Sequence, residues 1–146
     1  MISTAPGIDI LYIDNHLVAV YKPFGIPTQA DNKGSVSMLD LTREWIKNEF
    51  AKPGKAFLGM IHRLDQPVAG VVLFARTSKA AARISAQFRE RTVQKIYRAA
   101  VVGVPENPQG ALVFYLKKGK SYKATVFPRP APDARGSPSH SCRSCR

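Results

Sequence analysis

One aspartate in this chain combines a suitable charge with a suitable setting for chemistry. Asp65 lies in the decapeptide Ile-His-Arg-Leu-Asp-Gln-Pro-Val-Ala-Gly at positions 61–70, two residues after Arg63 and shortly before the apolar run 71–74. The apolar run predicts a strand, so the carboxylate is expected at a strand edge. A positive charge beside a carboxylate favours its ionised form. Asp65 is therefore the first candidate for a catalytic residue.

Two other sets of residues could take part in catalysis or metal binding, but their sequence patterns are weaker. His62 lies close to Asp65 and could be a general base, but we interpret it as a packed or hydrogen-bonded histidine. His140, Cys142 and Cys145 have the spacing His-x-Cys-x-x-Cys, which offers three zinc ligands and no fourth, in a proline-rich stretch. We expect no metal site.

The first half of the chain has patterns typical of a hairpin, a helix and a strand. Two β-type runs, 8–13 and 17–21, flank turn residues and predict a hairpin. Prolines and a glycine in 22–27 exclude a helix there. Apolar residues at three- and four-residue steps predict a helix over 36–50. A strand is expected over 70–75.

The second half of the chain also shows helix and strand patterns, and these end after residue 127. We predict a helix over 79–91, capped by Thr77 or Ser78, and a strand over 93–102. Two further runs, 111–116 and 122–127, predict a hairpin around the basic turn 117–120. Residues 128–146 are rich in proline, serine and arginine and are expected to be disordered. We therefore divide the chain into one domain, 1–127, and a tail, 128–146.

The charge of the chain favours a polyanionic partner. The net charge is +12, of which the tail carries +3, so residues 1–127 carry +9. No apolar stretch approaches the length of a membrane-spanning helix, and the N-terminus lacks the features of a signal peptide. The two cysteines lie in the last five residues, which excludes a disulfide framework. We expect a cytoplasmic, monomeric protein that binds nucleic acid and does not contact a membrane.

The decapeptide around Asp65 resembles the signature of the RluA-type pseudouridine synthases, which is His-Arg-Leu-Asp followed by a Thr/Ser-Gly stretch. The resemblance implies that Asp65 is the nucleophile and that Arg63 accompanies a nucleotide flipped out of the RNA. The alternative for Arg63 is a structural ion pair with Asp65 or a bond to a loop carbonyl. The implied fold is α+β, a mostly antiparallel mixed sheet with two main helices, as in the N-terminal part of the family's catalytic domain.

Further segments resemble the same family. Gln94-Lys-Ile-Tyr-Arg-Ala99 matches an element that implies stacking of Tyr97 on the target base; an ordinary aromatic on a β face is the alternative. Residues 11–28 contain the family's Lys-Pro-x-Gly, so Lys22 is expected to contact phosphate or to pack near the active site, unless it is a plain surface lysine. A basic face of the protein is expected to contact the RNA backbone. Its residues are Arg83, Arg89, Arg91 and Lys95.

The chain departs from the family pattern at two places. Val68 and Ala69 replace the usual hydroxyl pair after the signature. After Phe127 nothing matches the family's Gly-Arg-x-His-Gln-x-Arg segment, which supplies a basic residue near the catalytic aspartate. We interpret this as a reading-frame change or an early end. The expected consequences are an exposed apolar sheet face with an unpaired edge, and no basic partner for Asp65.

The resemblance implies that the chain isomerises uridine to pseudouridine in ribosomal or transfer RNA without a metal or redox cofactor. Whether the carboxylate attacks the sugar or assists departure of the base stays open at this point. One alternative is a catalytically impaired fragment that binds RNA. Another is a glycosidase-like hydrolase, which usually needs two carboxylates facing one bond, and no second acid stands out near Asp65.

Overall fold

The computed structural model describes residues 4–5, 8–30, 34–51, 56–104, 110, 114–118 and 124–127. The chain divides into two compact units, residues 1–96 and 97–146. The boundary at residue 127 and the disorder of the tail lie outside what the described residues test, so both stay predictions.

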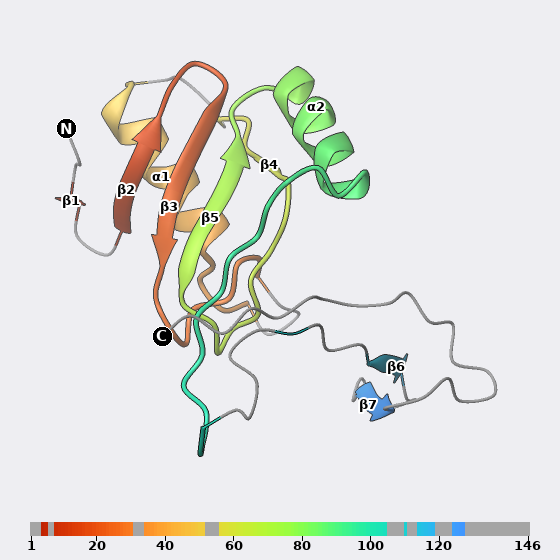
Figure 1. The fold of residues 1–146 in the computed structure, drawn as a ribbon. Coiled ribbons are helices and arrows are strands. Elements are labelled where there is room, and N and C mark those ends of the chain that lie inside the picture. The colour runs from red at the N-terminus through yellow and green to blue at the C-terminus, as the bar shows by residue number, and fades with distance from the viewer. Residues whose placement is uncertain are drawn as a thin grey trace. The chain divides into compact units, whose positions relative to one another are not determined.

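An antiparallel sheet forms the centre of the first unit (Figure 1). Its strand order is β1-β2-β3-β5-β4, with β1 Thr4–Ala5, β2 Ile8–Ile13, β3 Leu17–Lys22, β4 Gly59–Met60 and β5 Gly70–Ala75. The predicted hairpin and the strand over 70–75 are confirmed. The two-residue strands β1 and β4 were not predicted, because so short a strand is defined by its partner and not by a local pattern.

Asp14 closes the β2–β3 hairpin. Its carboxylate accepts hydrogen bonds from the backbone N–H groups of His16 at 2.7 Å and Leu17 at 2.6 Å, and from the Tyr12 hydroxyl at 2.7 Å. The bond from Tyr12 and the two backbone bonds lower the pKa of Asp14. This is how an aspartate stabilises a tight turn.

The helix α1, Met38–Glu49, covers one face of the sheet (Figure 1). It begins after Ser37, whose hydroxyl accepts from the Asp40 N–H, as expected of an N-cap. Its apolar side packs into the core with alternate residues of the strands, chiefly Met38, Trp45, Ile46, Val18, Val20, Val72 and Phe74. The prediction of a helix over 36–50 is confirmed.

The alternate residues of the strands form the other face of the sheet. Tyr21 lies opposite Val71 in the β3–β5 register, and both side chains are exposed, as is Tyr12 on β2. Ala19 and Ala75 lie on the same face and are buried. The exposed apolar face expected from the sequence is therefore observed only in part, at the end of the strands that carries Tyr21 and Val71.

The second helix, α2, spans Ser78–Arg89 and lies near β4 and β5 (Figure 1). Thr77 is the N-cap, since its hydroxyl accepts from the Ala80 N–H at 3.2 Å. Gly59 on β4 approaches this helix so closely that a Cβ placed there would lie 3.1 Å from the Ala81 Cβ. The predicted helix over 79–91 is confirmed, with ends one to two residues earlier. No helix in the described ranges is long and apolar enough to cross a membrane.

The prediction of a strand over 93–102 is wrong. The structure assigns no strand to these residues, and the Ile96 side chain is 80% exposed. The β-type sequence is present, but a strand needs a neighbour to satisfy its backbone groups. None of the strands described in the structure pairs with this segment.

Two antiparallel strands pair as a hairpin in the second unit. Its strands are β6, Tyr115–Lys118, and β7, Ala124–Phe127, with Tyr115 opposite Phe127 and Lys118 opposite Ala124. The predicted hairpin is confirmed. Its first strand continues through Lys117 and Lys118, which were expected in the turn. The α+β class with two helices and an antiparallel sheet is likewise confirmed.

Candidate active site around Asp65

Asp65 lies in the loop between β4 and β5, near the end of β5 where Gly70 pairs with Lys22. Its side chain is exposed. Its backbone carbonyl accepts from the Val68 N–H at 3.0 Å, which turns the loop toward β5. Among the described residues the carboxylate has no hydrogen bond and belongs to no ion pair; the ion pair that the structure shows joins Arg43 to Asp40. The carboxylate is therefore open to a substrate.

The backbone on the N-terminal side of Asp65 is held by Thr28. The Thr28 hydroxyl donates to the Leu64 carbonyl at 2.7 Å and accepts from the Leu64 N–H at 3.1 Å. Both residues are buried. One side chain thus satisfies both backbone groups of the residue that precedes Asp65.

The backbone on the C-terminal side is held through Gln66. The Gln66 carbonyl accepts from the Gly25 N–H at 3.0 Å, and the Gln66 side-chain amide donates to the Gly25 carbonyl at 2.8 Å. Gly25 has a φ of +87°, a conformation that favours glycine. Both neighbours of Asp65 are therefore tied to residues 22–28, and a polar side chain can be positioned by its neighbours' backbone bonds even when it has none of its own.

Lys22 links residues 22–28 to the Asp65 loop through its buried ammonium group. Its ammonium group donates to the carbonyls of Ile26 at 2.7 Å, Pro23 at 3.1 Å and Gln66 at 3.1 Å, and the side chain is 0% exposed. Burial lowers the pKa of Lys22, and the negative charge of Asp65 partly offsets this. The interpretation as a surface lysine is wrong. The three protons are used by carbonyls, so the geometry favours packing near Asp65 over a phosphate contact.

Gly70 allows the loop to enter β5. Its φ is +149°, and a Cβ at this position would lie 3.4 Å from the Leu64 Cδ1. The roles of Thr28, Gln66 and Gly70 were missed in the sequence. A threonine after a proline and a glutamine after an aspartate carry no local signal for bonds between distant segments.

Arg63 is exposed and shows neither of its expected structural contacts. Within the part of the chain that the structure describes, its guanidinium forms no ion pair with Asp65 and no hydrogen bond to a loop carbonyl. Its role toward a nucleotide stays a prediction.

His62 is a packed histidine, as interpreted from the sequence. Its Nε2 accepts from the Leu73 N–H at 3.0 Å, and its ring stacks on Phe88 with centroids 4.8 Å apart and planes inclined by 13°. Burial lowers the pKa of His62, and the nearby charge of Lys95 lowers it further. The neutral ring uses Nε2 as an acceptor inside the fold, so His62 is not placed as a base for substrate.

The expected RNA-backbone residues lie on and after α2. Lys95 places its ammonium 5.9 Å from the centroid of the Phe88 ring, and Arg89 and Arg91 are exposed. Tyr97 is the first residue of the second unit and is 60% exposed. The contacts of all four residues with RNA stay predictions.

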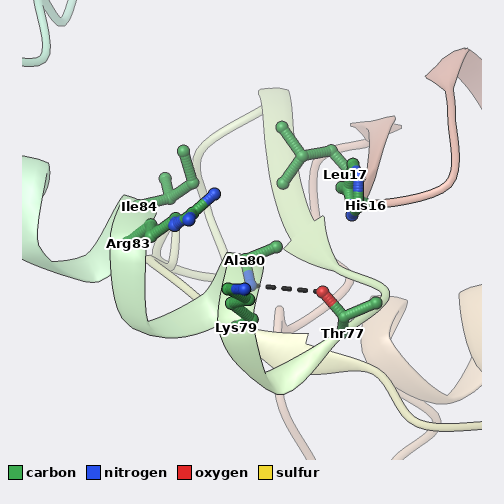
Figure 2. Close-up of a pocket in the computed structure, with 7 residues that line it drawn as sticks. All are labelled: His16, Leu17, Thr77, Lys79, Ala80, Arg83 and Ile84. Atoms are coloured by element: carbon green, nitrogen blue, oxygen red, sulfur yellow. Dashed lines mark hydrogen bonds between the residues drawn. The ribbon is translucent and has the colours of Figure 1, made fainter.

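Arg83 lines a cavity of about 390 Å³ at the first turns of α2 (Figure 2). The remaining lining residues are His16, Leu17, Thr77, Lys79, Ala80 and Ile84. Leu17 pairs with Ala75, five residues along the sheet from the pair of Lys22 with Gly70. At about 3.4 Å per residue, the cavity lies about 17 Å from the Asp65 end, so Arg83 does not belong to the same site.

Within the described ranges, no group of three or more His, Cys, Asp or Glu side chains could hold a metal ion. His140, Cys142 and Cys145 lie outside these ranges.

The fold agrees with the comparisons with known proteins. A sequence model of the RNA pseudouridylate synthase family matches residues 16–142. The chain belongs to this family, and its resemblance to the RluA type is confirmed by its relatives.

Two relatives and one solved structure give the scale of the similarity. The dual-specificity RNA pseudouridine synthase RluA of Haemophilus influenzae is 36% identical over 105 residues, which is 72% of this chain and 45% of the relative. The ribosomal large subunit pseudouridine synthase C of Vibrio vulnificus is 34% identical over 98 residues, which is 67% of this chain and 29% of the relative. Human RNA pseudouridylate synthase domain containing 4 superposes with a TM-score of 0.70 at 26% identity, covering 94% of this chain and 49% of that chain. The matched region thus spans less than half the length of each of these three proteins.

Proposed function

We propose that this chain isomerises uridine to pseudouridine in RNA, with Asp65 as the nucleophile. The observation that carries the proposal is an exposed carboxylate in a His-Arg-Leu-Asp loop, held through the backbones of both neighbours by Thr28, Gly25 and Lys22. Membership of the pseudouridylate synthase family supports it. A nucleophile needs access to substrate and a fixed position, and this geometry provides both.

The proposed reaction needs no external electron carrier. Asp65 attacks the sugar carbon as the base leaves with the electron pair of the C–N bond. The base then rotates, and its C5 forms a C–C bond to the same carbon and displaces the carboxylate. C5 loses its proton while the departed nitrogen gains one. All bonding electrons stay within the nucleotide, so the proposal includes no metal and no redox cofactor.

Two other residues have proposed roles toward the nucleotide. Arg63 is exposed two residues before Asp65, and a guanidinium can stack on bases and bind phosphate together. Tyr97 is proposed to stack on the target base, with its exposed ring as support. Arg83, Arg89, Arg91 and Lys95 are proposed to contact the RNA backbone, in keeping with the net charge of +12.

The proposed substrates are ribosomal RNA and transfer RNA. One relative is named as a dual-specificity RNA pseudouridine synthase and another as a ribosomal large subunit synthase. We also propose that the chain acts as a monomer in the cytoplasm, where the lack of cysteine before residue 142 suits a reducing compartment.

The test is product formation by the full chain and by Asp65→Asn. RNA labelled with tritium at uridine C5 releases the label when C5 loses its proton. We expect release by the wild type, none above background by Asp65→Asn, and wild-type release by Asp9→Asn, which changes an exposed carboxylate on β2. Equal release by the wild type and Asp65→Asn would refute the role of Asp65.

The second candidate function is RNA binding without catalysis. It is favoured by the lack of an ion-pair partner for Asp65 among the described residues, since the family supplies a basic residue at this point. A binding module would retain RNA on a filter, and neither the wild type nor Asp65→Asn would release tritium. If the chain is an enzyme, the wild type would release tritium and Asp65→Asn would not.

A further inference from the structure

Phe24 is an exposed aromatic side chain in the segment that holds the Asp65 loop. It is 72% exposed, whereas Phe74 in the core is fully buried. Single exposed apolar side chains are common on protein surfaces. The exposure of Phe24 differs from such cases, because hydrogen bonds hold the backbone on either side of it and the segment lies next to the candidate nucleophile.

The turn that carries Phe24 is closed around the Lys22 ammonium. The carbonyls of Pro23 and Ile26, which bracket the turn, both accept from this buried group at 3.1 Å and 2.7 Å. Gly25 supplies the left-handed backbone with a φ of +87°, typical of the third position of a tight turn. The inner side of the turn is therefore filled, and the Phe24 ring lies on its solvent side.

The same turn is bonded to the residue that follows Asp65. Gly25 and Gln66 exchange two hydrogen bonds, at 3.0 Å and 2.8 Å. Phe24 precedes Gly25, and Asp65 precedes Gln66, so the two side chains belong to adjacent backbone segments in fixed register. Arg63, also exposed, lies on the same loop as Asp65.

We propose that Phe24 is a stacking platform for an unpaired RNA base next to the target uridine. The inference rests on the proposed function and adds a binding residue to it. Aromatic rings stack on bases of any identity, and a side chain on a held turn loses little freedom when a base covers it. An RNA base is the occupant that fits, because the chain carries a net charge of +12 and an exposed arginine, Arg63, lies on the loop to which the turn is bonded.

The test compares RNA binding by Phe24→Ala, Phe24→Tyr and Phe57→Ala in the full chain. Phe57 is the matched control, since it is 53% exposed and precedes β4, whose Gly59 pairs with Ala75 at the opposite end of β5. The probe is a fluorescent RNA stem-loop with uridines in its loop. We expect Phe24→Ala to weaken binding by roughly 5- to 150-fold, and the other two variants to bind like the wild type. Thermal melts of all variants should coincide, because the ring is exposed.

Two results would overturn the inference: unchanged binding by Phe24→Ala, or an equal loss in Phe57→Ala. Failure of the proposed function gives a different pattern. If the wild type binds RNA in a Phe24-dependent way but releases no tritium, the platform stands and the isomerase activity fails. If Phe24→Ala releases tritium with the wild-type KM, the activity stands and the platform fails.

Discussion

Replacing Thr28 by valine removes one hydroxyl from the segment that holds Asp65 in place. Thr28 is 3% exposed, and its hydroxyl bonds both the N–H and the carbonyl of the buried Leu64. Valine has nearly the same shape, so the change opens no cavity, but two buried backbone groups lose their partner. A buried group without a partner costs about 1–3 kcal/mol. With two such groups, we expect Thr28→Val to lower the free energy of unfolding by about 2–6 kcal/mol.

The chain contains a matched control for this substitution. Thr42 is also buried, and its hydroxyl donates to the Met38 carbonyl at 2.6 Å within α1. That carbonyl keeps its regular helical N–H partner after Thr42→Val. Such a hydroxyl bond contributes little to a helix, so we expect a loss below about 1 kcal/mol.

Urea unfolding and thermal unfolding, both followed by circular dichroism, measure both variants. For a unit of this size, Thr28→Val should lower the melting temperature by about 8 °C or more. Tritium release should fall as well, because a displacement of about 1 Å near the reacting atoms can cost about 100-fold in rate. Equal losses for Thr28→Val and Thr42→Val would refute the idea that Thr28 holds Leu64.

Two further predictions concern pH. Burial lowers the pKa of Lys22 below its ordinary 10.5, so the native state releases this proton at a lower pH than the unfolded chain, and native stability rises through the window below 10.5. Urea unfolding gives the difference in the free energy of unfolding between the wild type and Lys22→Met. From about pH 7 to about pH 9.5 this difference should change in favour of the wild type; a constant difference would contradict this. Burial also lowers the pKa of His62 below 6.5, so this contribution to stability is complete above pH 6.5 and is lost as the pH falls through the native pKa. Melting temperatures should fall more steeply with acid in the wild type than in His62→Gln, whose amide can still accept from Leu73; parallel curves would count against a buried neutral ring.

Local sequence patterns were enough to predict most of the first unit. The hairpin of 8–13 and 17–21, the helix over 36–50 and the strand over 70–75 all depend on periodicity and turn residues within a few positions. The segment 93–102 has an equally good β pattern and forms no strand, because pairing is a property of two segments and not of one.

The chemistry of the site was visible in the sequence to a smaller extent. The His-Arg-Leu-Asp motif pointed to Asp65, and the packed state of His62 was expected. Packing of Lys22 near the active site was one of the alternatives, beside a phosphate contact and a surface position, but its full burial was not foreseen, since lysine is almost always a surface residue. Its burial requires three carbonyls to converge on the ammonium, and one of them comes from Gln66, 44 residues away.

By itself, then, the sequence determined the charge of the chain, its local elements and the loop that carries the candidate nucleophile. Only the tertiary structure decided how that loop is held. The bonds from Thr28 to Leu64 and from Lys22 to Gln66 join segments 36 and 44 residues apart. They form because β3 and β5 pair in a register that sets Lys22 opposite Gly70 and so brings residues 22–28 alongside Asp65. Such a register depends on the packing of a whole sheet face, which no local stretch of sequence encodes.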